Sequence, residues 1–304
     1  MSVVARGPTL DVIRKTGLVL HSADIRIGKP VQASAKAADL GPQDVVFSTV
    51  KATVPVALAR GVAPLLGPKT PIAPAQNGIP WWYGYRLPAD RPEPPDLRHL
   101  DPDGGLWALG AERCIGGIVM YASDMRDPGV AIDTNPKNNV LLLGEPDDQQ
   151  SERVQEVRAA LIAAGIGSPP VPDVRQAIWR KLMINMSASM IATITGHKLN
   201  MVAADPRLAA LYIRMANEAA SIARAHNIDM SGFNPVAWLP GASQHTPSIA
   251  VDLQRGRPME LDPIMLTPLD FARVAGVDTP SLDAIAALAV RAALDKGLVK
   301  ERVG

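Results

Sequence analysis

Short apolar runs alternate with longer amphipathic stretches along the first half of the chain. Residues 44–50 (Asp-Val-Val-Phe-Ser-Thr-Val) are nearly continuously apolar, which is typical of a strand buried on both faces. A helix is predicted from about 54 to 66, where Gly67-Pro68 ends it, and another strand covers 71–74. Strand, helix and strand in this order predict a parallel sheet with crossover helices.

The same pattern continues to a break near residue 168. Further strands are expected at 2–6, 17–21, 24–27, 114–121, 129–133 and 140–143, with helices at 10–15 and 150–164. Residues 80–110, rich in Trp, Tyr, Pro and Asp, are expected to lie outside the sheet. The Gly- and Pro-rich segment 165–171 indicates a boundary, so we predict domains at 1–168 and 169–304.

Beyond residue 172 the pattern predicts helices and no strands. Asp173 is a suitable N-cap for one helix that continues to about residue 195, where Gly196 ends it. Three further helices are expected to begin at Asp-Pro or Thr-Pro pairs, where a cap precedes a proline at the first helical position. These helices cover about 205–226, 246–256 and 279–297. The second domain is therefore predicted to be all-α.

Composition excludes several classes of function. The chain has 31 basic and 30 acidic residues, a net charge of +1, so we expect no nucleic-acid partner. No apolar run is long enough to span a bilayer, and the start of the chain lacks the layout of a signal peptide. Cys114 is the only cysteine and is expected to be a buried, inert thiol. We expect a cytoplasmic protein with no membrane contact and no metal site.

One helix of the second domain carries a polar stripe. Lys181, Asn185 and Ser189 are spaced i, i+4 and i+8, which places them on one helical face among apolar neighbours. Burying a lysine is costly without a partner, so the lysine could instead extend from a surface rim. The alternative is a cleft in which the lysine donates a proton and its two neighbours bind a substrate.

A second set of candidate residues follows His245-Thr246-Pro247. Ser248 is predicted in the first turn of a helix, where free N–H groups favour an anion such as a carboxylate. Glu260 follows a turn and opens the next helix. Each residue also has a simpler interpretation, an ordinary helix start for Ser248 and a solvated first-turn acid for Glu260.

Polar residues also follow the predicted strands of the first domain. Lys51 and Asn77 come just after two neighbouring strands, and Arg6 follows the first strand. Ligands of open α/β sheets bind outside the carboxyl ends of the strands, so these are suitable positions for cofactor contacts. An acid at the position of Arg6 would pair with a ribose hydroxyl, whereas an arginine favours the extra phosphate of NADP.

Taken together, these segments resemble the ordered motifs of the 2-dehydropantoate 2-reductase (ketopantoate reductase) family over nearly the whole chain. The segments are Val4-Ala5-Arg6-Gly7, Val50-Lys51-Ala52, Gln76-Asn77-Gly78, Lys181-Leu182-x-x-Asn185 and Ser248-x-x-x-Asp252 with Glu260. The resemblance implies a Rossmann-like parallel-sheet domain that binds NADP, followed by an all-helical substrate domain. It also implies hydride transfer from NADPH to a 2-keto acid, with 2-dehydropantoate as the expected substrate and pantoate as the product. A homodimer is left open.

The resemblance assigns roles to particular residues. Lys181 would protonate the developing alkoxide, and Asn77 would contact both the cofactor and the reacting centre. The remaining substrate contacts would be Asn185, Ser189 and Ser248, and the remaining cofactor contacts would be Arg6, Lys51, Ser123 and Glu260, of which Glu260 would also help to fix the lysine.

The chain departs from the family pattern in two places. The family opens with a strand and a G-x-G-x-x-G turn, and no such run occurs in this sequence. A start codon assigned too far downstream and a truncated gene would both have this effect. We expect the former, because the other motifs are intact. Ser189 stands where the family has a second asparagine, so another bulky 2-keto acid, or a catalytically silent homologue that acts as a binding module, remains an alternative.

Overall fold

A parallel strand pair forms where the order of strand, helix and strand predicts it. The computed structural model describes residues 1–135, 138–300 and 302. Strands β5 (Val46–Ser48) and β6 (Ile72–Pro74) run parallel, and helix α2 (Pro55–Val62) lies between them in the chain. Strands β1 (Ser2–Val4) and β4 (Gln32–Ser34) form a second parallel pair. The predicted Rossmann-like α/β class with parallel pairing is therefore confirmed.

The other strands of the described chain add pairings that the sequence did not predict. A four-stranded sheet has the order β3-β2-β9-β8, from Ile25–Lys29, Leu18–Ser22, Val130–Asp133 and Ser123–Asp127. Strands β7 (Gly116–Val119) and β10 (Leu141–Gly144) pair antiparallel. Strands β4 and β8 were both missed, and β8 is largely exposed and polar, so it lacks the apolar alternation by which a strand is recognised.

The core of this part of the chain lies between strands β6 and β10 and one helix. Helix α4 (Glu152–Ala163) begins at Ser151, whose hydroxyl accepts the N–H of Val154, and it packs against β10. The packed side chains are Ala73, Ile115, Leu141, Leu143, Val154, Val157 and Leu161. Helices α1 (Gly7–Thr16) and α3 (Gly105–Leu109) also belong to this part of the chain.

Two compact units divide the described chain. The first contains residues 1–50, 54–75 and 103–172. The second contains 173–304 together with two segments from the first half, 51–53 and 76–102. The predicted excursion outside the sheet thus belongs largely to the helical unit. The expected domain boundary at residues 168 and 169 stays a prediction.

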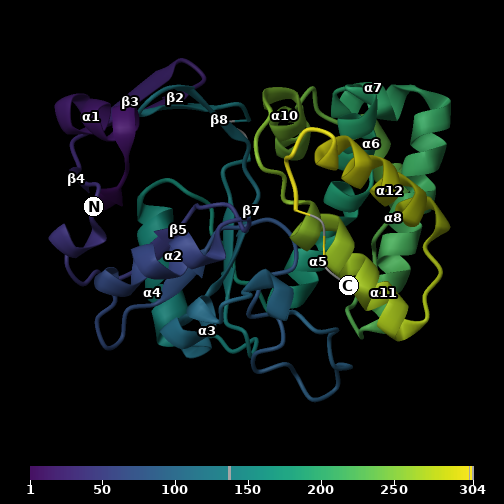
Figure 1. Cartoon of the computed structure of the whole chain (residues 1–304), viewed down its shortest axis with the longest axis horizontal. Helices are drawn as coiled ribbons and strands as arrows, with labels where there is room; N and C mark the ends of the chain where they lie inside the picture. Colours follow the sequence, from purple (N-terminus) through teal and green to yellow (C-terminus); the bar gives the residue numbers. More distant parts are fainter. Residues whose placement is uncertain (136–137, 301, 303–304) are drawn as a thin grey trace. The chain divides into compact units, whose positions relative to one another are not determined.

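Helices make up the regular structure of the second unit, as predicted. Besides two short 3₁₀ helices, Arg98–Leu100 and Leu239–Gly241, they are α5 (Val174–Met186), α6 (Ala188–Thr195), α7 (Leu199–Ala204), α8 (Pro206–Ala225), α9 (Pro235–Trp238), α10 (Ser248–Arg255), a π-helix (Asp262–Leu266), α11 (Thr267–Ala275) and α12 (Pro280–Leu294) (Figure 1). None of the helices that the structure describes is both long and apolar enough to cross a membrane.

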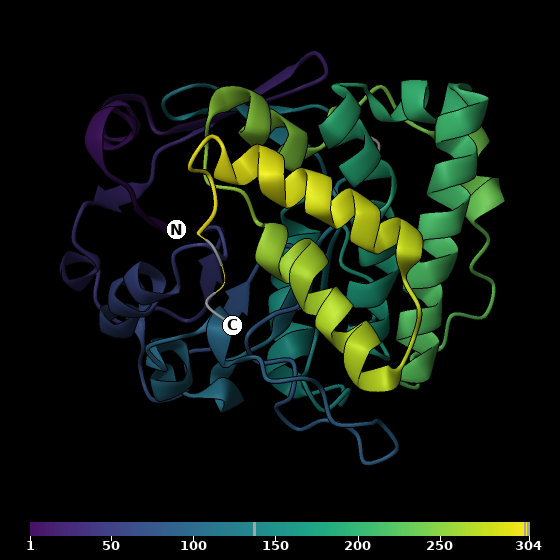
Figure 2. The same ribbon diagram turned by 45° about the vertical axis from the view of Figure 1, so that its right-hand side comes forward.

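Helix α8 is central to this unit. Its N-cap, Asp205, accepts the N–H groups of Arg207 at 2.8 Å and Leu208 at 3.3 Å, which fixes the start predicted from Asp-Pro. Helices α5, α7, α11 and α12 all pack against α8, and Figure 2 brings α12 forward beside it. Buried alanines let these helices approach closely; on α8 they are Ala209, Ala216, Ala219, Ala220 and Ala223.

The prediction of one continuous helix from 173 to 195 is wrong in one respect. It breaks at Ser187, whose backbone has φ −109° and ψ −90°, so that α5 and α6 are separate helices. The Ser187 hydroxyl donates to the carbonyl of Met183, one turn back. Serine in this position competes with the helical hydrogen bonds and bends the chain. Ser189 therefore does not continue the face of Lys181 and Asn185.

The aromatic segment after Asn77 is packed as core. Trp82 and Tyr83 are almost fully buried, and the Tyr83 hydroxyl accepts the indole N–H of Trp179 at 2.9 Å. The Arg175 guanidinium, also buried, donates to the Tyr83 carbonyl at 2.9 Å from Nε. These contacts with α5 fix the start of the 76–102 segment on the helical unit.

Candidate active site

Helix α5 presents Lys181 and Asn185 one turn apart. Lys181 is partly buried, and Asn185 is too. Burial lowers the pKa of Lys181 from 10.5 to about 8, and the charge of the Glu260 carboxylate opposes this shift. A lysine with this pKa changes its protonation state near neutral pH, which suits it to proton transfer.

Glu260 is the centre of a hydrogen-bonded cluster. Its side chain is buried, with the residue only 6 % exposed. Oε1 accepts the backbone N–H of Ala52 at 2.9 Å, and Oε2 accepts Nδ2–H of Asn77 at 3.4 Å. Burial raises the pKa of Glu260, whereas these two hydrogen bonds and the charge of Lys51 hold it down. One carboxylate therefore joins residues that follow two different strands of the chain.

Lys51 has its own acidic partner. Its Nζ lies 2.6 Å from Oδ2 of Asp252, which is buried on α10, and also donates to the Pro258 carbonyl at 3.1 Å. The lysine side chain is 37 % exposed and that of Asp252 is 7 % exposed. Asp252 and the Pro258 carbonyl thus hold the ammonium of Lys51, while more than a third of the lysine side chain stays exposed to solvent.

The two serines predicted to bind substrate differ in burial. Ser189 is buried on α6, whereas Ser248 is exposed as the first residue of α10. Helix α10 packs against α6. Ser248 lies one turn before Asp252 and has the first-turn position that the sequence predicted. The substrate roles of both serines stay predictions.

Two predicted cofactor contacts belong to the first compact unit. Arg6 is exposed at the residue before α1, after strand β1, as predicted. Ser123 is exposed at the start of β8, in the four-stranded sheet. Their cofactor roles stay predictions, and so do those of Lys51, Asn77 and Glu260, which belong to the second unit, where Asn77 contacts Glu260 and Lys51 contacts Asp252.

Sequence reasoning gave no role to two groups in this cluster. One is the Asp252 carboxylate, which the motif contained but which was not assigned a partner. The other is the backbone N–H of Ala52. Asp252 carries a detectable signal, because it is an acid at i+4 from Ser248 on the buried side of α10. The Ala52 amide has none, because any residue other than proline offers the same group.

The arrangement can supply a proton and stabilise negative charge. A ketone that accepts a hydride develops charge on its oxygen, and a nearby ammonium such as Lys181 both stabilises that charge and provides a proton. The buried Glu260 favours the charged form of this lysine.

Comparisons with known proteins agree with this arrangement. The family model "Ketopantoate reductase PanE/ApbA" matches residues 1–84, and the model "Ketopantoate reductase PanE/ApbA C terminal" matches 173–292. A 2-dehydropantoate 2-reductase of Mesorhizobium japonicum is 34 % identical over 300 residues, which cover 98 % of this chain and 91 % of the relative.

Solved structures show the same fold. A protein of Ralstonia solanacearum MolK2 described as a ketopantoate reductase superposes with a TM-score of 0.87 at 30 % identity, covering 98 % of this chain and 91 % of its own. A D-mandelate dehydrogenase, solved with NADH and anilino(oxo)acetate, has a TM-score of 0.78 at 16 % identity, covering 96 % and 89 %, and shows the fold alone. On the evidence of the two family models and the Mesorhizobium relative, this chain belongs to the ketopantoate reductase family.

Proposed function

We propose that this chain reduces a 2-keto acid with NADPH as the hydride donor, and that its preferred substrate is 2-dehydropantoate. The observation that carries the proposal is the buried Glu260 carboxylate, which accepts hydrogen bonds from Ala52 and Asn77 and whose charge favours the protonated form of Lys181 on α5. The name of the Mesorhizobium relative, a 2-dehydropantoate 2-reductase, supports the choice of substrate.

The residues present fit the nicotinamide end of such a cofactor. Lys51 and Asn77 follow the carboxyl ends of the parallel strands β5 and β6, where open sheets bind ligands. Within the described part of the chain, the Ser48 hydroxyl at the end of β5 is buried without a hydrogen-bond partner, as expected beside a ligand site. Lys51, Asn77, Ser123 and Glu260 would contact the cofactor, which supplies the hydride when bound.

The protein's own side chains would bind the substrate and transfer the proton. Lys181 would hold a proton on Nζ and deliver it to the oxygen of the reduced ketone. Asn185, Ser189 and Ser248 would hold the substrate, with the free N–H groups at the start of α10 favouring its carboxylate. Glu260 would keep Lys181 charged and Asn77 in place through the bond to Nδ2.

The preference for NADPH rests on Arg6. Its exposed guanidinium follows β1 at the position where the 2′-phosphate of NADP is expected. A guanidinium can bind a phosphate through two parallel hydrogen bonds, whereas the 2′-hydroxyl of NAD offers no such charge.

An absorbance assay at the nicotinamide band tests the proposal. The purified chain would be mixed with NADPH or NADH and with 2-dehydropantoate or bulkier 2-keto acids. We expect turnover with 2-dehydropantoate and a higher kcat/KM for NADPH than for NADH. A preference for NADH would reject the role of Arg6. If no 2-keto acid is reduced while either cofactor binds in a calorimetric titration, the chain is a binding protein instead.

A further inference from the structure

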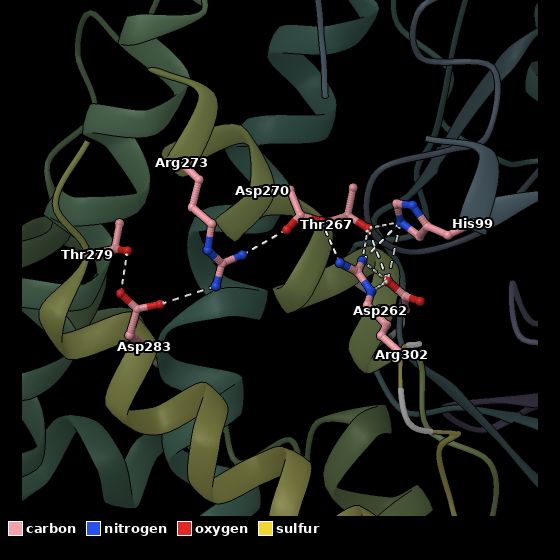
Figure 3. Close-up of polar contacts among 8 residues, drawn as sticks. All are labelled: His99, Asp262, Thr267, Asp270, Arg273, Thr279, Asp283 and Arg302. Atoms are coloured by element: carbon pink, nitrogen blue, oxygen red, sulfur yellow. Dashed lines mark hydrogen bonds and ion pairs between the residues drawn. The ribbon is translucent and has the colours of Figure 1, made fainter. Parts of the chain in front are cut away.

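A cluster of polar side chains contacts the π-helix that follows Glu260 in the chain. This cluster takes no part in the chemistry above. Figure 3 shows its contacts, which run from His99 through the π-helix to Thr279. Its inner members surround Arg302, near the end of the chain; they are His99, Asp262, Thr267 and Asp270. The π-helix that they hold begins two residues after Glu260.

The π-helix has a cause in the sequence. Thr267 donates its N–H to the carbonyl of Asp262, five residues earlier, instead of to the residue four back. Pro268 follows, and proline has no N–H to offer to Ile264 while its ring disfavours an α-helical turn before it. Single wide turns of this kind are uncommon and occur often at functional sites.

This turn carries the residues that hold the candidate site. Ile264 donates its N–H to the Glu260 carbonyl at 3.3 Å, and Ile79 donates to the Pro263 carbonyl at 2.8 Å. Gly78 lies so close to the turn that a Cβ there would be 2.3 Å from the Pro263 oxygen. The position of the turn therefore sets the backbone of Glu260 and of the loop that contains Asn77.

Arg302 binds both ends of the same turn. Nε donates to Oδ1 of Asp262 at 3.0 Å, and Nη2 donates to Oγ1 of Thr267 at 3.0 Å. Nη1 reaches Oδ2 of Asp270 one turn further along, and Nη2 also lies 2.9 Å from Nε2 of His99. A rigid guanidinium fork can join several acceptors at once, which a lysine cannot do in the same geometry.

We infer that Arg302 is a positioning residue for the proposed reductase. It braces the π-turn by bridging Asp262 and Thr267, whose Oγ1 also donates directly to Oδ1 of Asp262 at 3.2 Å, and the braced turn keeps the Glu260 carboxylate against the Ala52 amide and the Asn77 side chain. The inference rests on the proposed function for its effect on catalysis. The effect on the geometry of the turn can be measured without any substrate.

Hydrogen exchange on the whole chain, read by NMR or mass spectrometry, tests the geometry. The variants are Arg302→Ala and Arg302→Lys, and the control is Arg291→Ala, which removes an arginine paired with Asp295 on the surface of α12. Loss of the Arg302 guanidinium should speed hydrogen exchange at the backbone amides of Ala52 and Ile79 by roughly tenfold, because the hydrogen bond of each amide depends on the position of the π-turn. Arg302→Lys should behave like Arg302→Ala, since it keeps the charge but loses the fork.

Steady-state kinetics on the same proteins tests the consequence. A displaced carboxylate should lower kcat by roughly tenfold or more and leave the KM for the keto acid nearly unchanged. Wild-type exchange at both amides in Arg302→Lys would overturn the inference, and so would wild-type kcat in that variant of an active enzyme. If the unmodified chain reduces no keto acid, the proposed function fails, while the exchange experiment still decides whether Arg302 holds the turn.

Discussion

Asp252 holds Lys51 through an ion pair of 2.6 Å between Oδ2 and Nζ, and eight positions further along the chain Glu260 holds the next residue, Ala52, through its backbone N–H. Two acids of the helical unit thus fix consecutive residues of the segment that follows strand β5. The ammonium of Lys51 is the group that the family pattern assigns to the cofactor. Asp252 therefore sets where that charge lies, although it need not touch a ligand itself.

Replacing Asp252 by asparagine should weaken cofactor binding. Lys51 would lose its charged partner while keeping its own charge, so it would no longer be held at the end of β5. Because the lysine is more than a third exposed, the loss should be modest, about 1 kcal/mol or roughly fivefold in the Kd for NADPH, measured by fluorescence titration. Asp295→Asn, at an exposed pair with Arg291, is the matched control. Equal affinities for both variants would argue against the role.

Lys181→Ala should depress turnover far more than binding. If the ammonium acts as the general acid, its removal should lower kcat at least about 100-fold, the low end of the usual range. NADPH affinity and folding should stay near the unmodified values, because the alkoxide forms only in the reaction. Lys198→Ala, at an exposed lysine before α7, controls for loss of a charge. If the Lys181→Ala protein keeps more than half of the kcat, Lys181 is not the proton donor and only extends from a surface rim.

The rate of ketone reduction should fall as pH rises through about 8. Burial lowers the pKa of Lys181 to about 8, and only the protonated lysine can donate a proton to the alkoxide. Above that pH the active fraction should decline about tenfold per unit, and the reverse oxidation, which needs the free amine, should gain instead. Profiles of kcat against pH in both directions check this. A reduction rate that stays flat from pH 7 to 10 would exclude Lys181 as the donor.

Local signals in the sequence were sufficient for the helix ends. Asp173 and Asp205 were predicted as N-caps and do accept backbone N–H groups in that role. Gly256 was predicted to end a helix and lies at φ +62°, where glycine is favoured. These features depend on residues only a few positions apart, so the chain specifies them without its tertiary structure.

Features that depend on distant residues could not be predicted in the same way. The bond between Ala52 and Glu260 joins residues 208 positions apart and uses a backbone group that every sequence has. The break at Ser187 depends on which acceptor its hydroxyl finds, and a serine within an apolar run does not reveal this. Residue types could nominate Lys51, Asn77, Lys181 and Glu260 for one site, but only the fold brings the first two to the carboxylate.

Gly78→Ala should cost more stability than the backbone angle alone explains. Gly78 has φ +85°, and its new Cβ would lie 2.3 Å from the Pro263 carbonyl oxygen, which belongs to the π-turn. Gly196 has φ +72° with no atom within 4 Å of the same position, so Gly196→Ala measures the strain of the angle by itself, about 1 kcal/mol. Gly78→Ala should lower the free energy of unfolding in urea by roughly 2–4 kcal/mol. Equal losses for the two variants would contradict the close contact.

His226 should make the protein less stable as pH falls from 7.5 to 5.5. Its Nε2 lies 2.9 Å from the Phe271 carbonyl, and its buried Nδ1 has no hydrogen-bond partner in the part of the chain that the structure describes. Burial lowers the pKa of His226 below 6.5, against the opposing effect of the bond to Phe271. Near pH 6 the unfolded chain therefore binds more protons at this residue than the folded one, so the free energy of unfolding is lost as pH falls through 6.5 and below. His226→Gln can keep the donor to Phe271 but cannot titrate. Its Tm should consequently drop less between pH 7.5 and 5.5 than that of the unmodified chain, whatever the cost of the substitution at pH 7.5. Parallel Tm curves for the two proteins would show that His226 contributes nothing to the pH dependence.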